Sequence, residues 1–143
     1  MKYLHSNNSL EFVSNSVSAL VIDSSQNATF AGTVSDSKGD LRKIIQNYKT
    51  AAYTLIASDS GKHILTTTGT VTIPANVFSS AGGDAITIVN HSGSDITIAQ
   101  GSGLTMYNTA DGSTGNRTLA GRGMCTVLFN DVASCYISGA GLS

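Results

Sequence analysis

The sequence predicts an all-β protein, and three observations support this class. Hydrophobic residues make up 41% of the chain and charged residues only 12%, so a core can form while the polar surface is built largely from Ser, Thr, Asn and Gly. Apolar and polar residues alternate with period two in many short segments. Turn-forming clusters separate these segments every 8–15 residues or so, as in an antiparallel β-sandwich or jelly roll.

The N-terminal third of the chain predicts an arm of thin strands. Residues 17–22 alternate in the strand pattern, and residues 27–34 alternate again after a turn. Few large apolar side chains lie in this part, and two or three thin strands are not stable alone, so the arm needs a partner. Residues 41–48 could instead form one short helix. We therefore divide the chain into an N-terminal arm or docking region, 1–50, and a C-terminal β-sandwich head, 51–143.

The head carries the clearest strand signals. A strand over 71–73 ends at Pro74, which cannot donate a ladder hydrogen bond. The segments 86–88 and 96–98 each place two isoleucines on one face and flank a polar turn, so we expect them to pair as a hairpin. A last hairpin is expected to join residues 124–129 to 133–137 about Asn130-Asp131. The glycine pair around Arg122 lacks the lysine of a phosphate-binding loop, so it predicts a turn or a close-packed strand edge.

The expected placement of the two cysteines depends on that last hairpin. If the chain turns at Asn130, Cys125 and Cys135 lie five residues on either side of it and face each other across the ladder. A disulfide between directly opposed strands would be strained. We predict two buried free thiols.

Charge and motif content argue against several functions. The net charge is −1, whereas nucleic-acid binding needs a basic face. No apolar run approaches the length of a membrane span, and the N-terminus lacks the apolar core of a signal peptide. His5, His63 and His91 show no metal-ligand spacing, Glu11 is the single glutamate, and no nucleophile elbow occurs. We expect a protein that is not an enzyme and needs no metal or cofactor.

The order of several short motifs resembles virion proteins of bacteriophages, especially tail-fibre-like proteins of cyanobacterial and other marine phages. The resemblance covers about residues 28–143. The motifs that carry it are AGTVSDSKGDLR at 31–42, YTLIASDSGKHI at 53–64, VTIP at 71–74, ITIVNHS at 86–92, ITI at 96–98, GNRTLA at 115–120 and ISGAGLS at 137–143. Two departures stand out, because similar sequences often carry Pro near Ile45 and Trp near Tyr136.

The resemblance implies a virion structural protein made in the cytoplasm of the host bacterium. Such modules sit at the C-terminal end of tail fibres or other surface appendages and are expected to form homotrimers, here with intertwined arms, alongside other virion proteins. Arm packing in the trimer is expected to involve Val17, Val21, Phe30 and Val34. A capsid decoration or cement protein is the alternative, and a glycan-degrading enzyme is the least favoured class.

Contact with a host surface glycan is a further hypothesis for the head. Aromatic rings can stack on sugar faces while polar loops supply hydrogen bonds. The longest polar loop runs from Asn108 to Arg117 and follows Tyr107. The residues expected to contact a receptor are Tyr107, Asn108, Asp111 and Asn116.

Overall fold

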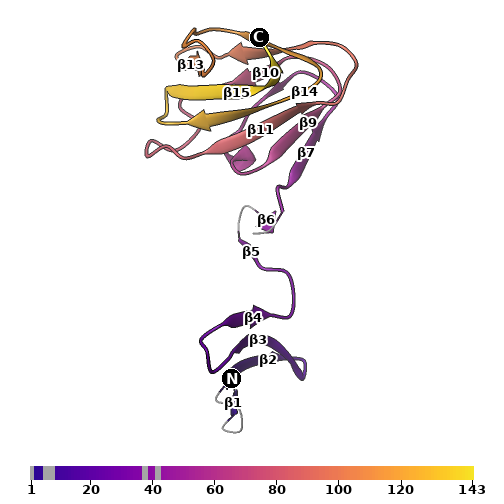
Figure 1. Cartoon of the computed structure of the whole chain (residues 1–143), viewed down its shortest axis with the longest axis vertical. Helices are drawn as coiled ribbons and strands as arrows, with labels where there is room; N and C mark the ends of the chain where they lie inside the picture. The colour runs from indigo at the N-terminus through magenta and orange to yellow at the C-terminus, as the bar shows by residue number, and fades with distance from the viewer. Residues whose placement is uncertain (1, 5–8, 37–38, 41–42) are drawn as a thin grey trace. The chain divides into compact units, whose positions relative to one another are not determined.

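A computed structural model describes residues 2–4, 9–36, 39–40 and 43–143 (Figure 1). The described residues confirm the all-β class, with one short 3-10 helix. The strands are β1 (Lys2–Leu4), β2 (Ser9–Ser14), β3 (Val17–Ile22), β4 (Ala28–Phe30), β5 (Ser35–Asp36), β6 (Gly39–Asp40), β7 (Gln46–Lys49), β8 (Tyr53–Thr54), β9 (His63–Thr66), β10 (Val71–Ile73), β11 (Ala85–Asn90), β12 (Ile96–Gln100), β13 (Thr105–Asn108), β14 (Arg117–Phe129) and β15 (Ser134–Leu142), and the helix is η1 (Ala57–Asp59).

The chain divides into an N-terminal unit, Met1–Lys43, and a C-terminal unit, Ile44–Ser143. This boundary lies before the expected one near residue 50, because β7 pairs with β9 and so belongs to the larger sheet of the C-terminal unit. The short helix considered for 41–48 is wrong where the structure describes this segment, since Gln46–Lys49 is a strand. Its apolar residues Ile44 and Tyr48 are exposed and so do not share a buried face.

The N-terminal unit contains an antiparallel sheet in the order β1-β2-β3-β4 and a small β5-β6 ladder. The strand expected at 17–22 is confirmed as β3, whereas the strand expected over 27–34 is formed only as β4. Among residues 9–35 and Lys43 of this unit, whose burial the structure describes, no hydrophobic side chain is buried. Burial of apolar area is the main stabilising term in folding, so strands β2, β3 and β4 have little core of their own.

The C-terminal unit is a sandwich-like sheet that combines parallel and antiparallel pairs. Strands β7, β9 and β11 are parallel neighbours in one half, and β8, β10 and β12 are parallel neighbours in the other. The chain therefore passes alternately through the two halves, and each passage through one half provides the crossover that parallel pairing in the other requires. The long strands β14 and β15 complete the sheet in antiparallel pairing with each other.

The hairpin expected between 86–88 and 96–98 does not form. Strand β11 pairs with residues 124–128 of β14, and β12 pairs with residues 117–119 of the same strand. A register irregularity between Leu119 and Met124 separates these two parts of β14. Here Arg122 has a positive φ of 67°, and a Cβ on Gly121 would lie 2.6 Å from the carbonyl oxygen of Gly93. The close packing expected at this glycine pair is thus confirmed.

The last hairpin is confirmed, but its register differs from the expected one. Cys125 lies opposite Gly139, and Cys135 lies opposite Phe129, so the turn is centred beyond Asn130 and the two thiols are not cross-strand partners. Both cysteines are buried and free, as predicted. They belong to a core in which isoleucines of both sheet halves meet Phe129 and Met106. Burial alone raises the pKa of each thiol to about 12.

Candidate functional site

The predicted receptor loop is held by its own hydrogen bonds. The backbone N–H of Asn108 donates to the carbonyl oxygen of Ser113 at 2.8 Å, and that of Gly112 donates to the carbonyl oxygen of Asn108 at 2.8 Å. The carboxylate of Asp111 accepts the hydroxyl of Ser113 at 2.6 Å and its backbone N–H at 2.9 Å. These bonds to Ser113 lower the pKa of Asp111. The loop therefore presents a fixed negative charge on a stable turn.

Asn116 has a structural role in this region. Its side-chain oxygen accepts the backbone N–H of Gln100 at 2.9 Å. The side-chain oxygen of Gln100 in turn accepts the backbone N–H groups of Met106, at 3.0 Å, and Gly115, at 2.9 Å. Together these bonds connect β12, β13 and the end of the loop. Asn116 thus positions the loop through its side-chain oxygen.

Tyr107 forms an aromatic pair that the sequence analysis did not identify. Strands β13 and β15 are parallel neighbours, and their register places Tyr107 beside Tyr136. The two rings stack with centroids 5.5 Å apart and an interplanar angle of 28°. Both side chains remain accessible, at 36% for Tyr107 and 46% for Tyr136. Period-two alternation along β15 places Tyr136 on an outward position, but only the pairing of β13 with β15 shows that Tyr107 is the ring beside it.

On the outer face of β13-β15-β14-β11-β9-β7, Arg122 is the single Asp, Glu, Lys or Arg residue at an outward position, and its guanidinium donates to the carbonyl oxygen of His91, just after β11, at 2.6 Å. Alternating burial along these strands identifies the outward residues. They are Thr105, Tyr107, Ser134, Tyr136, Ser138, Ala140, Arg122, Met124, Thr126, Leu128, Ala85, Thr87, Val89, His63, Leu65, Gln46 and Tyr48. Arg122 is thus the one residue of fixed charge on this broad surface.

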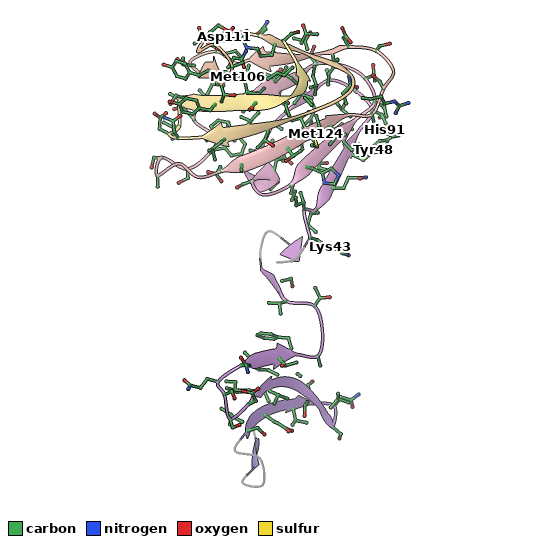
Figure 2. The ribbon with its side chains drawn as sticks, in the orientation of Figure 1. Lys43, Tyr48, His91, Met106, Asp111 and Met124 are labelled. Atoms are coloured by element: carbon green, nitrogen blue, oxygen red, sulfur yellow. The ribbon has the colours of Figure 1, made fainter. Side chains whose placement is uncertain are left out.

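One register row across this face is entirely apolar, and we call it the apolar row. It runs Tyr48, Leu65, Val89, Met124 and Ala140 across five neighbouring strands. Tyr48 is 53% exposed and Met124 is 52% exposed. Figure 2 labels these two residues, and it labels Asp111 of the receptor loop in another part of the same unit.

A shallow hollow lies along the apolar row. It has a volume of about 360 Å³ and is lined by Ile44, His63, Thr87, Val89 and Met124. A sheet with one face in water normally carries polar residues on that face. The exposed row and its hollow depart from that pattern, which marks this surface as one that another apolar surface can cover.

The other half of the sheet has a different outer surface. Cross-strand partners there are Thr54 with Thr72, Thr72 with Ala99, and Thr97 with Thr118. Threonine hydroxyls can bond to water, so this face needs no further partner. The two outer faces thus differ in polarity although the same core lies beneath both.

The buried polar groups of the C-terminal unit serve the fold. Asp59 is fully buried, and its carboxylate accepts hydrogen bonds from the hydroxyl of Tyr53 at 2.8 Å and the side-chain amide of Asn47 at 2.8 Å. Burial, followed by this contact with Asp59, raises the pKa of Tyr53 to about 12.

Within the described part of the chain, no group of three or more His, Cys, Asp or Glu residues is placed to hold a metal ion. No described helix is long and apolar enough to cross a membrane.

The expected arm-packing residues do not share one surface. Phe30, at 50% exposure, lies opposite Leu20, which lies opposite Phe12 on its other side, so these three form one row. Val21 pairs with Thr29 and Glu11 and therefore lies on the opposite face of the sheet. Val17 is exposed at the start of β3, and Val34 follows β4 outside any strand. The row around Phe30 is the apolar surface of this unit.

Comparisons with known proteins give no relative. No family model matches the chain, and neither a curated protein nor a solved structure is significantly similar to it.

Proposed function

We propose that this protein is a non-enzymatic structural component of a bacteriophage particle, in a tail fibre or other surface appendage, and that it works as a homotrimer. The observation that carries the structural role is the broad outer face, on which Arg122 is the single Asp, Glu, Lys or Arg residue, crossed by the apolar row. Exposed apolar surface of this kind is typical of proteins that assemble. The assignment to a phage particle rests on the resemblance of residues 28–143 to tail-fibre-like sequences.

Electron microscopy of particles labelled with an antibody against this chain tests the proposal. The particles come from the phage whose genome encodes the protein, and particles lacking the gene serve as the control. Gold particles on the tail or its fibres are the expected result. Regular label over the capsid would instead support the decoration or cement protein, and the absence of label from assembled particles would overturn the virion role.

The stacked pair Tyr107 and Tyr136 supports host contact as part of this function. Both rings are exposed beside a hydrogen-bonded polar loop, and such rings offer a flat, amphipathic surface for a glycan. The double variant Tyr107→Ala/Tyr136→Ala should assemble normally and reduce adsorption to the host on the order of tenfold, as loss of about 1.4 kcal/mol of binding would.

A matched control for that experiment is Thr54→Ala/Thr97→Ala on the threonine face, which should adsorb like the unmodified particle. Normal adsorption by the double tyrosine variant, with the protein present in the particle, would rule out the pair as a receptor contact. It would leave the structural role in place.

A further inference from the structure

We infer that the apolar row is the surface through which one copy of this chain binds another copy. This inference rests on the proposed self-assembly but not on the place of the protein in a particle. It also assigns the contact to the C-terminal unit, whereas the sequence placed it in the arm. The row is formed by Tyr48, Leu65, Val89, Met124 and Ala140, with Ile44 beside it at the hollow.

The chemistry of the row fits a protein contact. Its exposed members include a tyrosine and a methionine, two residue types that are enriched in the cores of interfaces. Methionine adapts its shape to an opposing surface because its side chain is unbranched and flexible. The hollow between Ile44 and Met124 offers a recess of about 360 Å³ for an apolar side chain of the other copy. Water leaves both surfaces when they meet, and this is the favourable term.

The scarcity of charge on the outward positions favours a second copy over an unrelated protein. In a symmetric assembly the same surface patches come together repeatedly around the axis. A charged residue close to that axis would lie near its own counterparts, and like charges opposed in an interface weaken it. Arg122 is the single Asp, Glu, Lys or Arg among the outward residues of this face, and its guanidinium is bonded to the carbonyl oxygen of His91. Copies that keep Arg122 away from the axis can therefore approach without that cost.

The size of the face also suits self-association. The outward residues of the six strands, with Arg122 included, number seventeen. At about 4.8 Å between strands and about 6.7 Å along each strand, they cover roughly 550 Å² in projection. A standard interface buries about 800 Å² on each partner once side-chain relief is counted. The apolar row of the N-terminal unit, by comparison, spans only the three strands that carry Phe12, Leu20 and Phe30.

The test compares two single substitutions that place the same charge on opposite outer faces. Met124→Asp alters the apolar row, and Thr97→Asp alters an exposed strand position on the threonine face. Both positions point away from the core, so both variants should keep the strand-type circular dichroism spectrum of the full-length protein. Molar mass is then measured by light scattering during size exclusion over a range of protein concentrations.

The expected result is a mass of about three times 14.7 kDa for the unmodified chain and for Thr97→Asp. Met124→Asp should give a folded monomer, with association weakened on the order of a hundredfold or more because a charge has to be buried. Tyr48→Asp repeats the test at the other end of the row if Met124→Asp does not fold.

Three outcomes would overturn the inference. The first is a monomeric unmodified chain at tens of micromolar, and the second is an unchanged oligomer for both row variants. The third is dissociation by Phe30→Asp while the row variants keep their mass, which would place the contact in the N-terminal unit. A failed particle assignment is recognised separately, since antibody labelling would then be negative although the oligomer and its sensitivity to Met124→Asp remain.

Discussion

The substitution Asn90→Leu tests how the two halves of the large sheet are joined. Asn90 is fully buried at the end of β11. Its side-chain NH₂ group donates to the carbonyl oxygens of Ser94 at 2.8 Å, Ala120 at 2.9 Å and Leu119 at 3.1 Å. Its oxygen accepts the backbone N–H of Ser92 at 3.0 Å and the hydroxyl of Ser92 at 2.7 Å. One amide thus connects the β11–β12 connection with the irregular part of β14.

Leucine has a similar size but cannot donate or accept these bonds. A buried carbonyl that loses its partner costs about 1–3 kcal/mol, and a part-buried one costs less because water can reach it. For the one buried and two part-buried carbonyls we expect a loss of about 3 kcal/mol in the free energy of unfolding. That is a large share of the 5–15 kcal/mol typical of a domain.

Urea denaturation followed by tyrosine fluorescence measures this change, since the chain has five tyrosines and no tryptophan. With a denaturant dependence of about 1–3 kcal/mol/M, the midpoint should fall by about 1–3 M at an unchanged slope. Asn116→Leu is the matched control, because it removes one exposed hydrogen bond to Gln100 and should cost under about 1 kcal/mol. Equal midpoints for Asn90→Leu and the unmodified chain would refute the reasoning.

Two more predictions concern the β14–β15 ladder. Burial raises the pKa values of Cys125 and Cys135 from 9.0 to about 12. The neutral thiols of the folded state therefore contribute stability that is complete below pH 9 and is lost as the pH rises toward 12, at about 1.4 kcal/mol per pH unit for each thiol. Cys135→Ala should make the measured decline in the free energy of unfolding shallower, and an unchanged slope would contradict this. A Cβ on Gly139 would lie 2.2 Å from the carbonyl oxygen of Met124, so Gly139→Ala should lower the free energy of unfolding by more than about 2 kcal/mol. The control is Gly93→Ala, because a Cβ there meets nothing within 4 Å, and it should leave the urea midpoint nearly unchanged.

Local patterns in the sequence predicted the strands well where one face is buried and the other is not. Residues 71–73 are a strand that ends before Pro74, and residues 17–22 are β3. The segment 41–48 was harder, because its apolar residues Ile44 and Tyr48 point to an exposed surface and so carry no information about the core. Their spacing resembled a helix face, but residues Gln46–Lys49 form a parallel edge strand beside β9.

The candidate site was predictable only in part. Tyr107 was identified because an aromatic residue precedes a long polar loop, whereas Tyr136 was missed because its partner strand is not its neighbour in sequence. The apolar row was missed for the same reason. Each of its members is an ordinary outward residue in its own strand, and the row exists only in the register that aligns five strands.

The sequence by itself determined the all-β class, the buried free thiols and the thin N-terminal unit, because period-two alternation, turn residues and apolar content are local properties. Tertiary structure alone decided which strands pair. The isoleucines of 86–88 and 96–98 alternate identically in a hairpin and in two strands that lie along one long neighbour, so the sequence pattern cannot separate these arrangements. In the structure the two segments lie along β14, which changes its partner from β12 to β11 at the register irregularity between Leu119 and Met124.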